Sequence, residues 1–288
     1  MTSAPAARRA AVLGSPIGHS LSPVLHRSAY ANLGLTWTYE AIECDTARLP
    51  ALLASLDDAF VGLSLTMPLK RAVLPLCDEV SPLAAAVGAA NTVTFDGIGP
   101  FRHRRADNTD VGAMVAAIRA RIAQVAGRTV AILGAGGTAA AAIAAIRELD
   151  LGGADVVVRD RARASELLAA ADRLGVAVSL AQWPAVDVLS RAGLVVSTVP
   201  AGAADSMAGV IRPDQLLFDV LYDPWPTPLA SAAHEAGAPV IGGLELLVRQ
   251  AALQIEIWSG RSLADAAVGM MRAAGAAALR ERAAGSAN

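Results

Sequence analysis

Short apolar runs alternate with longer stretches of helical periodicity along almost the whole chain. The runs predict strands at residues 10–13, 39–44, 61–65 and 92–96, and further strands at 129–133, 156–158, 194–197, 216–220 and 240–241. Such alternation is typical of βαβ units and a mainly parallel sheet. Helical patterns at about 245–258 and 263–280 have no strand after them, so we expect these last helices to return to the first part of the chain.

Composition and charge narrow the class of protein. Of the 288 residues, 54% are hydrophobic and 17% charged, which excludes a disordered chain, and no apolar run is long enough to span a membrane. A net charge of -2 gives no basic footprint for nucleic acid or for an anionic membrane. We therefore expect small-molecule chemistry, with neither nucleic acid nor membrane as a partner.

The cysteines and histidines form no metal or disulfide pattern. Cys44 and Cys77 are the only cysteines, and with four scattered histidines they give no zinc-ligand spacing. The first residues hold an apolar run too short for a signal peptide. We expect a cytoplasmic protein without a metal, and the sequence leaves open a monomer or a homodimer.

Lys70 is the only lysine among 24 basic residues, the rest being arginine. A sequence that uses arginine elsewhere retains lysine here, and lysine is a compact donor that can exchange its proton. Site chemistry is one interpretation, and a surface lysine kept by chance is the other.

A glycine-rich turn follows the predicted strand 129–133 and opens an alanine-rich helix. Gly134 permits a tight turn, Gly136 allows backbone to approach a pyrophosphate, and the helix N-terminus favours an anion. Strand, glycines and helix in this order predict a dinucleotide site formed by Gly134, Ala135, Gly136, Gly137 and Thr138.

The residues that follow the predicted strand 156–158 determine whether the site favours NADP or NAD. Arg159, Arg161 and Arg163 favour NADP, because arginine accommodates a 2′-phosphate. Asp160 is the opposite signal, since an acidic residue there bonds a 2′-hydroxyl, although it could equally cap a helix. We expect NADP, with NAD less favoured.

These patterns predict an α/β protein of two domains. We expect an open α/β substrate-binding and catalytic domain at 1–110, a Rossmann-like NADP-binding domain at 111–241 beginning with a helix from about Val111 to Val125, and C-terminal helices at 242–288 that pack on the first domain.

Polar residues gather where the predicted strands of the first domain end. Ser20 and Ser22 lie on a loop before a helix, with Ser22 and Pro23 as its expected N-cap and first position. Thr66 is expected to cap the helix that bears Lys70. The segments Ala90-Asn91-Thr92 and Asp107-Asn108-Thr109-Asp110 complete the constellation, at strand ends where open α/β sheets bind ligands.

Together these segments resemble the shikimate dehydrogenase family, and their amino-acid sequences are most similar to its actinobacterial branch. The resemblance covers nearly the whole chain and extends to the late segments at 219–224 and 243–250. It implies reversible NADPH-dependent reduction of 3-dehydroshikimate to shikimate, in the biosynthesis of chorismate and aromatic amino acids.

The resemblance also implies a role for each matched residue. Lys70 and Asp110 match the catalytic pair, the cofactor would contact the glycine turn, Arg159, Asp160, Arg163 and Gly243, and the substrate contacts would be Ser20, Ser22, Thr66, Asn91, Tyr222 and Gln250. Four positions depart from the family pattern. Ser64 stands where many members have Asn, which would shorten one polar contact, and Leu246 stands where Met is common. Val158 and Asp160, on either side of Arg159, replace the commoner Asn and Thr.

The chemistry can be argued from the reaction itself. Hydride transfer to a ring ketone builds negative charge on its oxygen, which requires a cationic donor beside it. Lys70 can stabilise that charge and deliver a proton, while a nearby Asp110 would keep it charged and oriented. Alternatives are a quinate/shikimate dehydrogenase using NAD or NADP, an aminoshikimate-pathway relative, and a noncatalytic sensor of nucleotide and metabolite.

Overall fold

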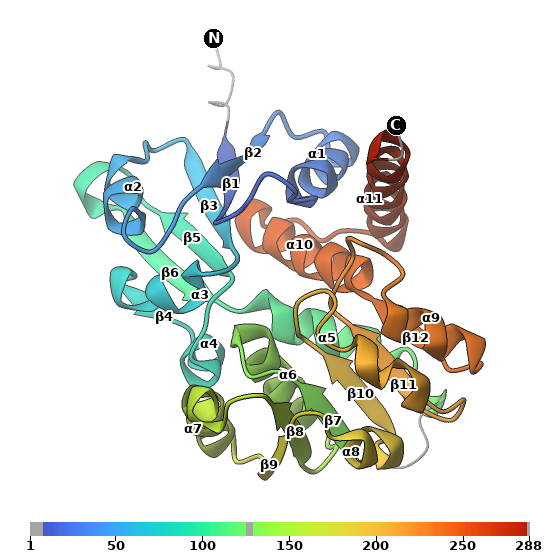
Figure 1. Ribbon diagram of the computed structural model, residues 1–288. Helices are drawn as coiled ribbons and strands as arrows, with labels where there is room; N and C mark the ends of the chain where they lie inside the picture. The colour runs from blue at the N-terminus through green and yellow to red at the C-terminus, as the bar shows by residue number, and fades with distance from the viewer. Residues whose placement is uncertain (1–7, 125–128, 287–288) are drawn as a thin grey trace. The chain divides into compact units, whose positions relative to one another are not determined.

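A computed structural model describes residues 8–124 and 129–286 as two compact units (Figure 1). Unit 1 comprises residues 1–85, 89–109 and 250–288, and unit 2 comprises 86–88 and 110–249. Unit 1 is therefore built from the beginning and the end of the chain, whereas nearly all of unit 2 is one continuous segment.

Unit 1 contains a mixed sheet with helices packed on it. Its strands are β1 (Arg9–Gly14), β2 (Thr38–Glu43), β3 (Phe60–Leu65), β4 (Glu79–Val80), β5 (Thr92–Asp96) and β6 (His103–Asp107), in the order β2-β1-β3-β5-β6-β4. β5 runs antiparallel to both β3 and β6, while β1 is parallel to its neighbours. Because β3 and β5 are antiparallel neighbours, the end of β3 and the start of β5 lie next to each other at one end of the strands.

The helices of unit 1 come from both ends of the sequence. They are α1 (Ser22–Asn32), α2 (Leu49–Ser55), α3 (Leu69–Ala72), α11 (Asp265–Ser286), most of α4 (Pro82–Val87) and the second half of α10 (Gly243–Ser259). α1 and α11 lie side by side (Figure 1). A core cluster that includes Leu13, Leu63, Leu69 and Val93 fills the space between α2, α3 and the sheet.

Unit 2 contains a parallel sheet. Its strands are β7 (Val130–Leu133), β8 (Ala154–Val158), β9 (Val178–Gln182), β10 (Leu194–Ser197), β11 (Leu216–Asp219) and β12 (Val240–Gly242). Read from β9, the order is β9-β8-β7-β10-β11-β12, which is the 3-2-1-4-5-6 order of a dinucleotide-binding sheet. β7, β10 and β11 are buried along their whole length, as expected for strands covered on both faces.

Helix α5 (Thr109–Arg119) precedes β7. Helices α6 (Gly137–Glu148), α7 (Ser165–Leu174), α8 (Val186–Arg191) and α9 (Pro228–Glu235) connect strands of this sheet. The helix expected from Val111 to Val125 is shorter, because a separate 3-10 turn at Ile122–Gln124 follows Arg119. Val125 lies outside the described residues.

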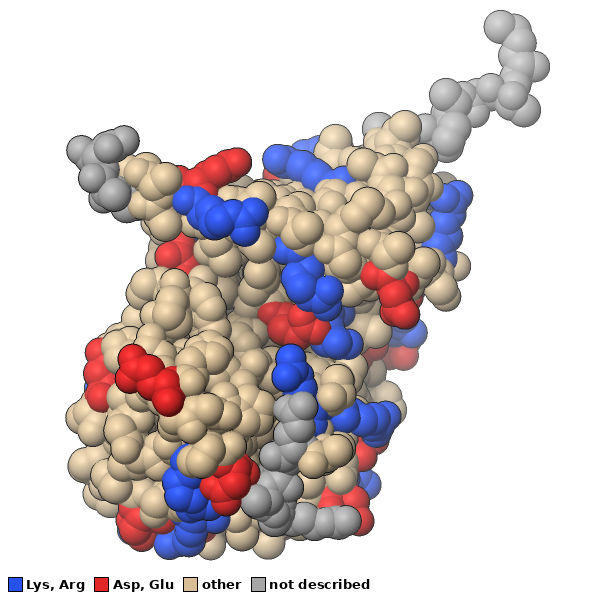
Figure 2. Space-filling model, turned by 90° about the vertical axis from the view of Figure 1, so that its right-hand side faces the viewer, with Lys and Arg blue, Asp and Glu red and all other residues tan. Residues whose placement is uncertain are grey.

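Charged residues of both signs are interspersed on the face drawn in Figure 2. Uncharged residues separate them into small groups. Among the helices of residues 8–124 and 129–286, none combines the length and hydropathy needed to cross a bilayer.

An aromatic cluster joins α1, β2 and α10 inside unit 1. The His26 ring stacks on Tyr39 at 3.8 Å between ring centroids and on Trp258 at 5.5 Å. Trp258 reaches this position because residue 62 is glycine: a Cβ there would lie 2.1 Å from the indole Nε1. The same Nε1 donates to the carbonyl of Val93 at 3.2 Å. Gly62 thus allows the end of α10 to pack directly on β3 and β5.

Burial of His26 predicts an acid-sensitive fold. Burial lowers the pKa of His26 from 6.5 to about 3, so the folded state keeps the ring neutral while the unfolded chain protonates it. Stability from this group is complete above pH 6.5 and is lost as the pH falls toward 3. We predict that His26→Phe flattens the decline of the unfolding free energy between pH 6.5 and about 4, by up to about 1.4 kcal/mol per pH unit.

Urea denaturation at a series of pH values measures this difference. His234→Phe is the matched control, since His234 is exposed on α9 and should leave the wild-type pH slope unchanged. Parallel curves for the wild type and His26→Phe would contradict the assignment.

Candidate active site

The glycine turn after β7 forms an open helix N-terminus in unit 2. Gly134 has φ +100°, and a Cβ on it would lie 2.8 Å from Thr198 Oγ1, so both backbone and packing require glycine. Gly136 precedes α6 with ordinary φ, and no atom lies within 4 Å of the place a Cβ would take. No side chain caps the first turn of α6, which begins with Gly137 and Thr138. Its backbone N–H groups suit the pyrophosphate of a dinucleotide.

The segment after β8 uses its charges in different ways. The Asp160 carboxylate accepts a bond from Ala162 N at 2.9 Å, so it caps the following 3-10 turn. Arg161 donates to the carbonyl of Leu180 at 2.8 Å. Arg159 and Arg163 are exposed. The capping interpretation of Asp160 is therefore confirmed, and Arg159 and Arg163 are better placed than Arg161 to meet a 2′-phosphate.

The serine loop of unit 1 differs from the expected cap. α1 begins at Ser22 itself, with Leu21 at the N-cap position and no capping side chain. The hydroxyl of Ser20 accepts the backbone N–H of Ser22 at 3.2 Å. The prediction that Ser22 caps the helix is therefore wrong: Ser20 supports the helix start, and Ser22 is buried within the unit.

Thr66 lies between β3 and the short helix α3, and Lys70 lies on α3. The prediction that Thr66 caps this helix is wrong, because the N-cap position falls at Pro68 and only the backbone carbonyl of Thr66 accepts a bond, from Leu69 N at 2.8 Å. Lys70 is half-buried on α3. Its carbonyl accepts the N–H of Ala90 at 2.7 Å, which places the lysine segment beside the start of β5.

Asn91 is the centre of a buried polar cluster. Its Oδ1 accepts bonds from Thr109 N at 2.8 Å and from Thr92 Oγ1 at 2.9 Å. Its Nδ2 donates to Thr109 Oγ1 at 3.0 Å and to Gln250 Oε1 at 3.4 Å. The two amides expected to bind substrate are therefore neighbours, although 159 positions separate them in the sequence.

Asp110 follows Thr109 in the first turn of α5 and is 5% exposed. A carboxylate is favoured there by the N–H groups at the helix N-terminus. Asp110 is also the first residue of the long continuous segment of unit 2.

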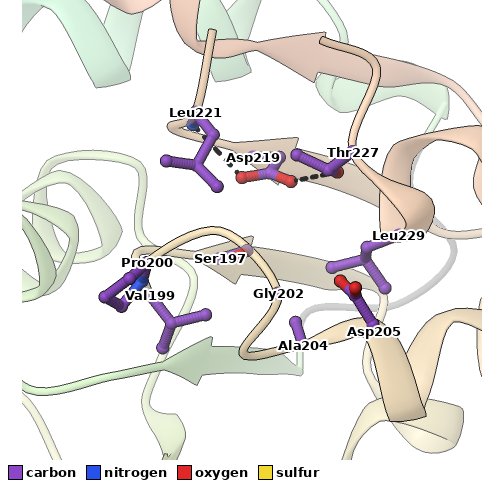
Figure 3. A pocket seen from close by; sticks show the side chains of 10 residues that line it. All are labelled: Ser197, Val199, Pro200, Gly202, Ala204, Asp205, Asp219, Leu221, Thr227 and Leu229. Carbon is purple, nitrogen blue, oxygen red and sulfur yellow. Dashed lines mark hydrogen bonds between the residues drawn. The ribbon is translucent and has the colours of Figure 1, made fainter. Parts of the chain in front are cut away.

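Tyr222 lies on a segment of unit 2 that Asp219 holds at both ends. The Asp219 carboxylate accepts bonds from Leu221 N at 3.2 Å and from Thr227 Oγ1 at 2.7 Å (Figure 3). Burial raises the pKa of Asp219, and hydrogen bonds from Thr227, Leu221 and Ser197 oppose that rise. The adjoining cavity has space for about one water molecule, so it cannot hold a nucleotide.

Gly243 lies at the start of α10. A Cβ there would lie 2.1 Å from the carbonyl oxygen of Val220, and Gly243 N donates to Leu221 O at 3.0 Å. Packing against the Tyr222 segment alone therefore requires glycine at this position.

Comparison with known proteins identifies the family. A family model described as the shikimate dehydrogenase substrate binding domain matches residues 12–93. A curated shikimate dehydrogenase (NADP(+)) from Citrifermentans bemidjiense is 36% identical over 264 residues, covering 87% of this chain and 89% of that protein. The chain belongs to the shikimate dehydrogenase family.

Solved structures agree with this assignment. A shikimate dehydrogenase from Mycobacterium tuberculosis is 41% identical with a TM-score of 0.82, covering 93% of this chain and 99% of that one. A shikimate 5-dehydrogenase from Thermus thermophilus, solved in complex with NADP(H) and shikimate, is 33% identical with a TM-score of 0.80, covering 94% and 100%. The predicted family and the two-domain α/β fold class are confirmed.

Two buried residues beside the polar cluster of Asn91, Tyr39 and Gln254, were not singled out by the sequence analysis, which named Ser64 only for a shortened contact. Tyr39 donates to Ser64 Oγ at 2.6 Å, and Ser64 Oγ donates to Gln254 Oε1 at 2.7 Å. The contact expected to be shortened at Ser64 is therefore replaced by two good hydrogen bonds. The available signal was the position of Gln254 one helical turn after Gln250, on the same face of α10.

The two glycines of the turn should respond differently to substitution. We predict that Gly134→Ala lowers the Tm by several degrees even without cofactor, because the substitution meets both positive φ and Thr198. Gly136→Ala should leave that Tm unchanged and weaken NADP binding about tenfold or more, because only the cofactor would meet its methyl group.

Thermal unfolding and NADP titration of both variants measure the two effects. Gly209→Ala is a matched control in unit 2, since no atom lies within 4 Å of its Cβ position and it is remote in sequence from the turn. Normal NADP affinity in Gly136→Ala would remove Gly136 from the cofactor site.

Proposed function

We propose that this protein catalyses the reversible NADPH-dependent reduction of 3-dehydroshikimate to shikimate, in the biosynthesis of chorismate and aromatic amino acids. The observation that carries the proposal is the buried cluster of Asn91, Thr109 and Gln250 next to the segment that bears Lys70. Such a cluster suits a ring with several hydroxyl groups. Relatives named as NADP-dependent shikimate dehydrogenases, over most of this chain, support the same activity.

We assign the substrate chiefly to residues of unit 1. Hydroxyls of Ser20 and Ser22 would hold the carboxylate near the start of α1. The remaining oxygens of the ring would bond to Thr66, Asn91, Tyr222 and Gln250.

The cofactor is assigned to unit 2. The open N-terminus of α6 fits a pyrophosphate, so Gly134, Ala135, Gly136, Gly137 and Thr138 would hold it. Arg159 and Arg163 would bond the 2′-phosphate, and Asp160 would act through the turn that it caps. Gly243 would contact the cofactor through its backbone, and NADPH would supply the hydride.

Lys70 and Asp110 would handle the proton. As the ketone is reduced, its oxygen gains negative charge and then a proton, which the Lys70 ammonium supplies. Asp110 would orient the ammonium. In the reverse direction the neutral Lys70 amine accepts the proton of the alcohol.

We also propose that the enzyme is cytoplasmic and is a monomer or a homodimer. Cys44 and Cys77 are free thiols, which suits a reducing compartment. Light scattering on the purified chain would measure its mass in solution.

Initial rates of nicotinamide reduction test the function. The purified protein is mixed with shikimate or quinate, each with NADP or NAD, at mildly alkaline pH. We expect fast reduction with shikimate and NADP, because Arg159 and Arg163 favour the 2′-phosphate. Preference for quinate or NAD would contradict the substrate or cofactor assignment, and binding without turnover would indicate a sensor.

Replacing the lysine tests the chemistry. We predict that Lys70→Ala lowers kcat by about 10²- to 10⁴-fold while the KM for shikimate changes much less, because the lost interaction acts on charge that develops during reaction. Lys70→Arg retains the charge without the compact donor and should not restore turnover. NADP titration checks that both variants fold, and near-normal kcat in Lys70→Ala would refute the assignment.

A further inference from the structure

A chain of hydrogen bonds runs through unit 1 from Tyr39 to Gln250. After Tyr39 and Ser64, Gln254 Nε2 donates to Thr92 Oγ1 at 3.0 Å and to the carbonyl of Asn91 at 3.1 Å. Thr92 Oγ1 then donates to Asn91 Oδ1 at 2.9 Å, and Asn91 Nδ2 donates to Gln250 Oε1 at 3.4 Å. Every donor in the chain points in the same direction, from β2 toward α10.

The chain is fully enclosed by the protein. Gln254 and Thr92 are 0% exposed, and Tyr39, Ser64, Asn91 and Gln250 are 5% exposed or less. A buried polar atom that loses its protein partner has little water to replace it. The direction of each bond is therefore held by the bonds on either side.

The direction begins at the Tyr39 hydroxyl. Burial raises the pKa of Tyr39, so this group keeps its proton and can donate to Ser64. Ser22 is a second hydrogen-bond partner of the same hydroxyl. The chain thus starts beside a serine assigned to the substrate carboxylate and ends at the amides assigned to the ring oxygens.

Gln254 connects Ser64 to Asn91 and Thr92, and its amide orientation determines which of these groups it accepts from and which it donates to. Its Oε1 accepts from Ser64, so both hydrogens of Nε2 face the Asn91 carbonyl and Thr92. Thr92, having accepted one bond, donates to Asn91 Oδ1, which also accepts the N–H of Thr109 at 2.8 Å, and Asn91 Nδ2 then faces Gln250. A rotated Gln254 amide would place its NH₂ against Ser64 and its oxygen against the Asn91 carbonyl.

We propose that Gln254 is a positioning residue that, through the Asn91 carbonyl and Thr92 and together with the N–H of Thr109, holds the amides of Asn91 and Gln250 in one arrangement. In this arrangement the Asn91 NH₂ donates to Thr109 and Gln250, and Gln250 turns its oxygen to Asn91, so the ring hydroxyls meet one pattern of donors and acceptors. Gln254 itself touches no substrate. This inference rests on the proposed function, which assigns Asn91 and Gln250 to the substrate.

Removing the amide of Gln254 tests the role. Gln254→Leu keeps similar volume and should raise the KM for shikimate about tenfold, with a smaller change in kcat and none in the KM for NADP. Gln215→Leu is the matched control: Gln215 is a 0% exposed amide of unit 2 that donates to the carbonyls of Leu189 and Ala192. It should lose stability without any change in the KM for shikimate.

A double-mutant cycle tests the chain itself. Ser64→Ala removes the donor to Gln254 Oε1 and should raise the KM for shikimate about threefold. The double variant should be no worse than Gln254→Leu alone, because both act through one path. The proposal would be overturned if the two substitutions multiplied their effects on the KM for shikimate in the double variant. It would also be overturned if folded Gln254→Leu had an unchanged KM, or if Gln215→Leu raised the KM equally.

A spectroscopic measurement separates this inference from the proposed function. The side-chain NH₂ signals of Asn91 and Gln250 in ¹⁵N-labelled protein report amide surroundings without catalysis. Gln254→Leu should shift or broaden both pairs of signals, and Gln215→Leu neither. Absence of shikimate turnover in the wild type would refute the function alone, whereas unchanged amide signals in Gln254→Leu would refute the positioning role alone.

Discussion

The polar groups of Asn91 must be satisfied inside the protein, and much of unit 1 is arranged around this requirement. Its backbone N–H donates to Asp107 O, and its carbonyl accepts from Leu65 N. Its side chain is bonded to Thr109 and to Gln250. These contacts bring together β3, β5, β6, the start of α5 and α10, so one buried residue connects segments from three parts of the sequence. Because an unsatisfied buried amide is costly, few other arrangements of these segments are permitted.

Unit 2 depends on a different constraint, the close approach of backbone segments. Gly134 turns the chain beside Thr198, and Gly243 begins α10 against the carbonyl of Val220. Asp219 fixes the segment that follows Val220 by accepting hydrogen bonds from Leu221 and Thr227. The strand ends of the parallel sheet can therefore carry polar residues while the strands themselves stay apolar.

Sequence patterns predicted the long, periodic elements well. The strand expected at 10–13 is β1 at Arg9–Gly14, and the helix expected at 245–258 is α10 at Gly243–Ser259. β9 was missed, because it is only partly buried and lacks a clear apolar run. Strong periodicity reflects a large buried surface, which local residue order records.

The errors concern single side chains whose partners are distant. The caps expected at Ser22 and Thr66 are absent, since the helices begin one or more residues away from where local rules put them. The Ser64–Gln254 bond spans 190 positions, so no local pattern could indicate it.

The order of synthesis has a consequence for the same bond. Nearly all of unit 2 is continuous and can fold as it leaves the ribosome. Asn91 and Gly62 meet their partners only after α10 has been synthesised, so unit 1 is completed last.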